Sequence, residues 1–257
     1  MENLFSLKGK TAIITGGYGY LGQDMAKTLD NFGAKVYVLG KSKEKFDGVF
    51  KSFDNVSFVE MDLSDSVSIK TAIQNVVDTE GAVDILVNNG YYGAANNPTE
   101  MTNNEWEVGI DGGLNSVFRC ILEVIPHMIN KESGKIINIA SMYGLTVPDF
   151  DVYKGFEDFL NPPNYGVAKS GVLHMTKYYA SYLGKFGITV NAISPGAFPS
   201  KLVQKKKGFI DNLVDNTALK RIGDPKDLRG TLILLASSAS DYITGQNMVV
   251  DGGWTIK

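Results

Sequence analysis

Seven short apolar segments recur along the chain and constrain its fold more than any other feature. They span residues 11–15, 35–39, 56–60, 84–89, 134–141, 188–194 and 247–250. Several are rich in β-branched residues and almost continuously apolar, which is typical of strands buried on both faces of a parallel sheet. Segments with helical apolar spacing lie between them, such as 24–33 and 68–81, and both of these end in glycine. The alternation predicts a doubly wound, Rossmann-like α/β fold with about seven strands.

Length and composition favour a single α/β domain over residues 1–257. A chain of 257 residues suits one large domain, and no low-complexity linker divides it. The net charge of −3 excludes a basic nucleic-acid surface. The N-terminus carries early charges, and no apolar run is long enough to span a membrane, so we expect a cytoplasmic protein with no membrane partner. Cys120 is the only cysteine and lies among apolar residues, which indicates a core position in a reducing compartment.

A glycine-rich turn, TGGYGYLG at residues 15–22, stands between the first predicted strand and the first predicted helix. Backbone N–H groups at such a helix start can bind a pyrophosphate, with help from the helix dipole. Gly16 permits the tight turn, Gly19 allows a phosphate to approach, and Gly22 allows the helix to pack on the strand. The turn therefore predicts dinucleotide binding by Gly16, Tyr18, Gly19, Tyr20, Leu21 and Gly22.

The end of the second predicted strand bears on which nicotinamide cofactor binds. A site for NAD usually places a carboxylate there, but this chain has Gly40, followed by Lys41 and Ser42. Lys41 can pair with a 2′-phosphate and Ser42 can donate a further hydrogen bond, so the sequence favours NADP(H), with NAD(H) as the alternative. A solvated lysine turn at these positions is the competing interpretation.

Further motifs follow in a fixed order and identify a resemblance. They are Asp62-Leu63, Val-Asn-Asn-Gly at 87–90, Ser141, Tyr165 with Lys169 four residues later, Pro195-Gly196, and the tail at 243–254. With the glycine-rich turn, this set resembles the one-domain branch of the short-chain dehydrogenase/reductase family, over nearly the whole chain. A Tyr-x-x-x-Lys pair alone is a common match. Its place within the ordered set of motifs supports a functional role for the pair.

The resemblance implies a catalytic role for Ser141, Tyr165 and Lys169. Tyr165 is the general acid/base, and Ser141 hydrogen-bonds the same substrate oxygen. A free phenol titrates near pH 10, so Lys169 and an oxidised nicotinamide are expected to lower the pKa of Tyr165.

The resemblance also assigns cofactor contacts outside the glycine-rich turn. Asp62 and Leu63 are expected to meet the adenine, and Asn89 and Gly90 the ribose and phosphates. In the segment that begins Pro195-Gly196, the Phe198 backbone and the Ser200 hydroxyl are expected to hold the carboxamide. No metal site is expected, because neither histidine has a ligand partner at useful spacing.

Two positions depart from the family pattern. Tyr20 stands where the one-domain branch usually has glycine, so the turn reads TGxxGxxG, as in the branch that includes nucleotide-sugar epimerases. Gly113 stands where the family usually has an asparagine that helps a proton relay. Asn115 lies two residues on and is expected on a different helix face, so the relay is rebuilt, shortened or absent.

The segment 142–163, between Ser141 and Tyr165, is longer than usual for the family. Its Pro and Gly content argues against a single helix. We expect it to form a substrate wall in which Tyr143, Asp149, Asp151 and Tyr153 line a site for a polyhydroxylated ligand; an exposed loop is the alternative. The run Lys205–Lys207 could steer a phosphate or carboxylate substrate, or be a solvated loop.

These features predict an NAD(P)-dependent oxidoreductase that interconverts a secondary alcohol and a ketone on a sugar, sugar acid or polyol. The alternatives are a nucleotide-sugar epimerase or dehydrogenase of glycan synthesis and a non-catalytic NADP-sensing regulator. The resemblance also implies a homo-oligomer, either a tetramer or a dimer.

Overall fold

The computed structural model describes residues 3–257 and contains one seven-stranded sheet in the order β3-β2-β1-β4-β5-β6-β7. Every neighbouring pair of strands is parallel. The strands are β1 (Thr11–Thr15), β2 (Lys35–Gly40), β3 (Val56–Glu60), β4 (Ile85–Asn88), β5 (Gly134–Ile139), β6 (Ile188–Pro195) and β7 (Asn247–Val250). All seven lie in the predicted apolar segments or end within one residue of them, and the predicted doubly wound fold is confirmed.

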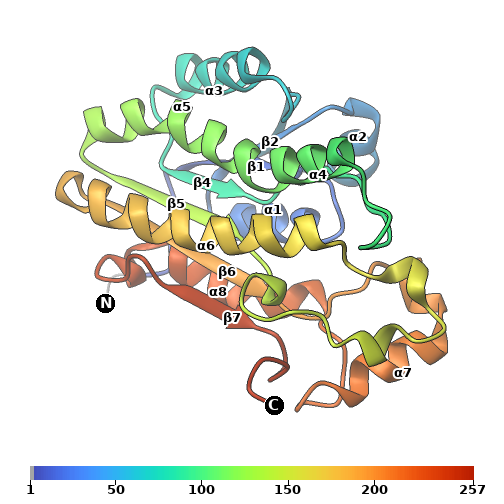
Figure 1. Cartoon of the computed structure of the whole chain (residues 1–257). Helices are drawn as coiled ribbons and strands as arrows, with labels where there is room; N and C mark the ends of the chain where they lie inside the picture. Colours follow the sequence, from blue (N-terminus) through green and yellow to red (C-terminus); the bar gives the residue numbers. More distant parts are fainter. Residues whose placement is uncertain (1–2) are drawn as a thin grey trace.

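Helices cover both faces of the sheet (Figure 1). On one face lie α3 (Ser66–Glu80), α5 (Ser116–Lys131) and α6 (Pro163–Leu183), and on the other lie α1 (Gly22–Asn31), α2 (Lys43–Phe50) and α8 (Arg229–Ala236). Successive strand residues point to opposite faces, so Ile13 joins the first core and Ile14 the second. Cys120 is buried in the first core, and burial raises its pKa to about 12, which fits a core residue.

The inserted segment 142–163 packs beside α7 (Lys207–Asp215) beyond one end of the sheet (Figure 1). It forms three short 3₁₀ helices rather than one helix, as its Pro and Gly content predicts. Phe209 of α7 is the centre of this packing, with its ring centroid 5.5 Å from that of Tyr153 and 5.0 Å from that of Phe159. The insertion is therefore anchored through aromatic side chains.

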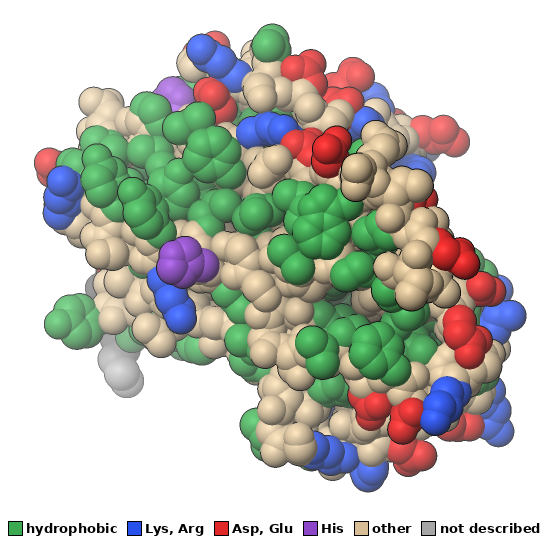
Figure 2. Space-filling model, in the orientation of Figure 1, with side chains coloured by type: hydrophobic (Ala, Val, Ile, Leu, Met, Phe, Trp, Pro, Cys, Tyr) green, Lys and Arg blue, Asp and Glu red, His purple; other side chains and the backbone are tan. Residues whose placement is uncertain are grey.

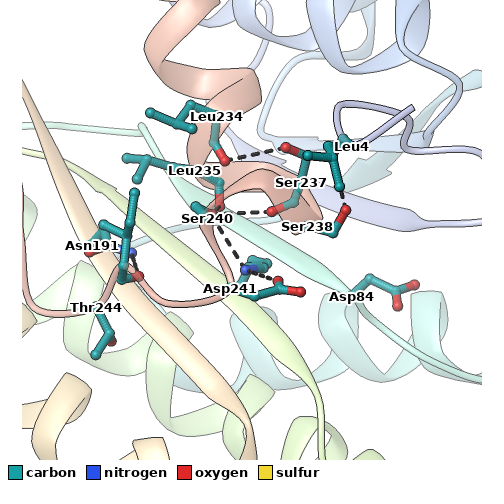
Figure 3. Close-up of polar contacts among 12 residues, drawn as sticks. Leu4, Asp84, Asn191, Leu234, Leu235, Ser237, Ser238, Ser240, Asp241 and Thr244 are labelled. Atoms are coloured by element: carbon teal, nitrogen blue, oxygen red, sulfur yellow. Dashed lines mark hydrogen bonds and ion pairs between the residues drawn. The ribbon is translucent and has the colours of Figure 1, made fainter. Parts of the chain in front are cut away.

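Polar contacts hold the other end of the sheet, where the strands begin (Figure 3). Ser238 donates to the Leu4 carbonyl at 3.0 Å, Lys135 pairs with Asp241 at 2.8 Å, and the Val190 N–H donates to Thr244 at 3.1 Å. These contacts fix the loop that leads into β7. Within residues 3–257, no helix is long and apolar enough to cross a membrane.

Gly113 lies in a π-helical turn (Asp111–Asn115) between α4 (Asn103–Ile110) and α5. A Cβ at this position would lie 2.7 Å from the Ala168 Cβ of α6. The glycine therefore allows the turn to approach α6 at the residue next to Lys169, and an asparagine side chain has no room there.

Replacing Gly113 with Ala should lower the free energy of unfolding by about 1–3 kcal/mol, because it overpacks this contact. Gly230→Ala in α8 is the matched control, since nothing lies within 4 Å of its Cβ position. Denaturant unfolding of both variants measures the difference. Equal stability of the two variants would show that the close approach is not a constraint.

Candidate active site

The predicted site residues gather at the carboxyl edge of the sheet, around two adjoining cavities. A cleft of about 680 Å³, here the glycine-turn cleft, is lined by Gly16, Tyr18, Gly19, Tyr20, Leu21, Gly22, Lys41, Ser42, Leu63, Asn89 and Gly90. A pocket of about 340 Å³, here the tyrosine pocket, is lined by Ser141, Tyr165, Lys169, Pro195, Gly196 and Phe198. Leu21, Asn89 and Tyr91 line both cavities. Of the predicted residues, Asp62 and Ser200 line neither.

The start of α1 is open to an anion. Its N-cap is Leu21, so no side chain caps the helix. In the part of the chain that the structure describes, the backbone N–H groups of Tyr20, Leu21 and Gly22 have no acceptor. Such free N–H groups at the positive end of a helix dipole suit a phosphate. The residues present therefore fit the pyrophosphate of a dinucleotide.

Two glycines make this turn possible. Gly16 has a φ of 61°, in the left-handed region that favours glycine. A Cβ on Gly22 would lie 2.5 Å from the Gly16 carbonyl oxygen. Tyr20, where the family usually has glycine, turns its hydroxyl toward the segment that follows β6 and accepts a hydrogen bond from Gln204 at 3.0 Å. The departure at residue 20 thus leaves the turn intact and adds a link to the segment that follows β6.

The end of β2 is covered by Tyr18, a contact that the sequence did not reveal. The Tyr18 hydroxyl accepts a hydrogen bond from the Ser42 N–H at 3.3 Å, and a Cβ on Gly40 would lie 2.6 Å from the Tyr18 ring. Packing against Tyr18 therefore requires glycine at position 40. This glycine also means that the position lacks the carboxylate usual in NAD sites.

Lys41 lines the glycine-turn cleft, but its charge already has a partner. Its Nζ lies 2.8 Å from a carboxylate oxygen of Asp62. Hydrogen bonds from Lys41 and Ser64 lower the Asp62 pKa to about 2. A 2′-phosphate would have to share or replace this ion pair.

Tyr165 and Lys169 lie one turn apart on α6, and both face the tyrosine pocket. Lys169 is only 5% exposed, and its Nζ donates to the Ile139 carbonyl at the end of β5, 2.8 Å away. The same Nζ lies 5.7 Å from the centroid of the Tyr165 ring. Burial lowers the Lys169 pKa to about 8. The predicted pair is therefore brought together at the carboxyl edge of the sheet.

The pKa of Tyr165 differs from the expectation. Burial raises it above its ordinary value, and the hydrogen bond with the Ser141 side chain only partly opposes this. Lys169, whose Nζ lies 5.7 Å from the centroid of the ring, does not lower the Tyr165 pKa in the protein alone. Ser141, at the end of β5, also accepts a hydrogen bond from the Tyr143 N–H at 3.1 Å.

Tyr91 is a wall residue that sequence reasoning missed. Its ring meets the Tyr165 ring edge-on, with centroids 5.4 Å apart, and the Lys169 Nζ lies 5.9 Å from its centroid. The available signal was its place in the sequence, directly after the Val-Asn-Asn-Gly motif. Asn115 is exposed and donates to Asp111 at 3.1 Å, so it takes no part in the site.

The insertion turns both of its predicted wall tyrosines inward and both of the predicted aspartates outward. Tyr143 and Tyr153 are buried and line the tyrosine pocket, as expected. Asp149 and Asp151 are exposed and do not line it, so the expectation for these two is wrong. Packing around Phe209 explains the division. Burial of an aromatic ring is favourable, whereas a carboxylate without a partner stays in water.

Comparison with known proteins identifies the family. A family model described as enoyl-(acyl carrier protein) reductase matches residues 20–255. A 3-oxoacyl-acyl-carrier-protein reductase, FabG of Staphylococcus epidermidis, is 34% identical over 252 residues, which cover 95% of this chain and 98% of the relative. The chain belongs to the short-chain dehydrogenase/reductase family. It is an oxidoreductase of that family, whose members use NAD or NADP.

Solved structures of the family superpose over almost the whole chain. A short chain dehydrogenase from Leptospira borgpetersenii with bound NAD⁺ has a TM-score of 0.87 and 31% identity, covering 99% of this chain and 96% of the other. A gluconate 5-dehydrogenase from Burkholderia cenocepacia, in complex with NADP and tartrate, has a TM-score of 0.89 and 28% identity, covering 99% and 98%.

Replacing Tyr165 with Phe should lower kcat by about 10²–10⁴-fold, because the proton-exchanging hydroxyl is lost. Cofactor affinity should stay within about twofold, because the glycine-turn cleft is untouched. Tyr182→Phe, on the exposed side of the same helix, is the control. Steady-state kinetics and cofactor titration measure both effects; full turnover in Tyr165→Phe would remove this residue from the mechanism.

Replacing Lys169 with Met should raise the free energy of unfolding at pH 7 by roughly 1–3 kcal/mol. The folded protein holds this amine with its pKa lowered from 10.5 to about 8. The free-energy cost of burying the charged amine is therefore fully present below about pH 8. As the pH rises from about 8 toward 10.5, the wild type loses that cost and the two proteins should converge. Denaturant unfolding across this range is the measurement. A gap that does not change with pH would contradict the lowered pKa.

Proposed function

We propose that this protein is an NADP(H)-preferring oxidoreductase that interconverts a secondary alcohol and a ketone. The observation that carries the proposal is that Ser141, Tyr165 and Lys169 line one pocket, which shares lining residues with the glycine-turn cleft. A substrate in the pocket would place its reacting oxygen near the Tyr165 hydroxyl and its reacting carbon toward the cleft. The same three residues argue against a regulator that binds NADP without turnover.

In this mechanism the chain binds, orients and exchanges a proton. The free N–H groups at the start of α1 bind the pyrophosphate, and Ser141 orients the substrate oxygen. Tyr165 donates its phenolic proton when a ketone is reduced and accepts a proton when an alcohol is oxidised. The nicotinamide supplies hydride exchange and, when oxidised, a positive charge that favours the phenolate. Burial of Tyr165 keeps it a phenol in the protein alone, so proton exchange is coupled to the bound cofactor.

The proposed substrate is a sugar, sugar acid or polyol. The neighbouring gluconate 5-dehydrogenase structure and the tyrosine hydroxyls of the pocket support this class. The FabG relatives favour a second candidate, reduction of a 3-oxoacyl thioester. A spectrophotometric screen of sugars, sugar acids, polyols and an acetoacetyl thioester with both nicotinamides tests the two candidates. No turnover of any of them, with cofactor binding intact, would overturn the enzymatic proposal and favour the regulator.

A nucleotide-sugar epimerase differs in its redox balance. An epimerase returns its cofactor to the oxidised state, whereas the proposed enzyme changes the absorbance at the reduced-nicotinamide band. Product analysis after incubation with catalytic amounts of cofactor therefore separates the two.

The proposed setting for this chemistry is the cytoplasm.

Replacing Lys41 with Asp should shift the cofactor preference at least about tenfold from NADP(H) toward NAD(H). The change removes the cation that faces a 2′-phosphate and supplies a carboxylate for the ribose hydroxyls. Lys43→Asp is the control, since Lys43 pairs with Asp47 and does not line the cleft. Fluorescence titration with both reduced cofactors measures the shift; unchanged affinities would make Lys41 a surface residue only.

We also propose that the protein is a homo-oligomer that pairs through α5 and α6. Hydrophobic side chains gather over these two helices (Figure 2), and Phe118, Leu122, Tyr178 and Tyr182 are each more than 40% exposed there. Exposed apolar patches of this kind mark interaction surfaces.

Leu122→Glu should lower the solution mass measured by analytical ultracentrifugation, because it places a charge in the proposed interface. Val67→Glu on α3 is the control, since Val67 is also apolar and exposed but lies on another helix. A monomeric wild type, or an unchanged mass in Leu122→Glu, would overturn the proposal.

A further inference from the structure

The tyrosine pocket has almost no charge. Lys169 is the one charged side chain among the described residues that line it, and its ammonium already donates to the Ile139 carbonyl. Asp149 and Asp151 of the insertion are exposed outside the pocket. Lys205, Lys206 and Lys207 are exposed as well and do not line it.

One wall of the pocket is aromatic and is held by packing among its own rings. Phe159 stacks on Phe209 with centroids 5.0 Å apart, and Tyr153 packs against the same ring. All three line the pocket together with Leu213 and Val203. Apolar faces of this kind suit the carbon skeleton of a ligand and offer nothing to a free anion.

Two tyrosine hydroxyls supply the polar element of this wall. The Tyr143 and Tyr153 hydroxyl oxygens are 2.6 Å apart, and the Asn161 amide donates to Tyr153 at 3.4 Å. The pair has two O–H hydrogens, and the bond between them uses one. In the described part of the chain, no acceptor takes the second hydrogen. A buried donor without a partner costs free energy, so the pocket is built to receive an acceptor.

We propose, resting on the function proposed above, that the substrate is uncharged and carries a second oxygen that accepts a hydrogen bond from the Tyr143–Tyr153 hydroxyl pair. Its carbon skeleton lies against Phe159 and Phe209. Within the wider class of sugars, sugar acids and polyols, this selects the neutral sugars and polyols and excludes carboxylates and phosphates. Burial raises the pKa of Tyr143, which keeps the pair able to donate.

Of residues 3–257, Lys169 is the one cation that lines the pocket, and it lies beside Tyr165 at the reacting end. An anion held at the Tyr143–Tyr153 hydroxyl pair would lose its hydration and meet an O–H group rather than a cation. A neutral oxygen loses much less hydration free energy and accepts a hydrogen bond from the free O–H group. The charge state of the substrate is therefore the property that this wall selects.

Three ring ketones test the proposal on the wild-type protein with NADPH: 3-oxocyclohexane carboxamide, the corresponding carboxylate, which matches it in size, and 3-methylcyclohexanone. The amide should have the highest kcat/KM, at least about 100-fold above the carboxylate. It should exceed the methyl compound, which lacks the second oxygen, by about tenfold. A carboxylate as good as the amide, an amide no better than the methyl compound, or no reduction of any of the three overturns the inference. The screen of the previous section tests the oxidoreductase proposal separately.

The double variant Tyr143→Phe/Tyr153→Phe tests the role of the hydroxyl pair. It removes both O–H groups and keeps both rings, so the amide-to-methyl ratio of kcat/KM should fall about tenfold, to near one. A purely structural role would lower both rates and leave the ratio unchanged, which would contradict the assignment. Tyr242→Phe, at a fully exposed tyrosine, should leave the ratio as in the wild type. The wild-type comparison decides the inference if the double variant does not fold.

Discussion

The hydrogen bond from the buried Lys169 ammonium to the Ile139 carbonyl is the contact on which the site depends. It joins α6 to the end of β5, the strand that also delivers Ser141. Tyr165 lies one helical turn before Lys169, so the same contact fixes the phenol beside Ser141. Burying an ammonium is unfavourable, as its lowered pKa shows. The fold bears this cost where the chemistry needs a cation, a common feature of active sites.

The two halves of the site are built in different ways. The cofactor half uses free backbone N–H groups at the start of α1 and close approaches that only glycine allows, as at Gly22. The substrate half uses side chains from the insertion and from α7, which meet only in the folded protein. A dinucleotide site of the first kind is shared across a family, whereas a pocket of the second kind differs with each inserted segment. The proposed function therefore assigns substrate choice to the insertion and to the rings around Phe209.

This difference explains what the sequence could predict. Strands buried on both faces read as continuous apolar runs, so β1 to β7 were found within a residue or two. The Tyr165 and Lys169 pair and the glycine-rich turn are local patterns whose geometry follows from helix periodicity. The contacts of Tyr18 with Gly40, of Tyr91 with Tyr165, and of Gly113 with Ala168 join distant segments, and no local pattern encodes them. The inward packing of Tyr153 and Phe159 involves Phe209, which lies more than forty residues away in the sequence.

The pKa of Tyr165 is the decisive quantity, because the protein alone is expected to keep this group a phenol and bound oxidised cofactor to make it acidic. The measurement is an ultraviolet titration of tyrosinate, taken as the difference between the wild type and a protein with Phe at 165, with and without NADP⁺. We predict that the difference signal titrates above the ordinary tyrosine value of about 10 in the free protein and moves toward neutrality when NADP⁺ is bound. A phenolate already present at neutral pH in the free protein, or a titration that NADP⁺ does not move, would contradict it.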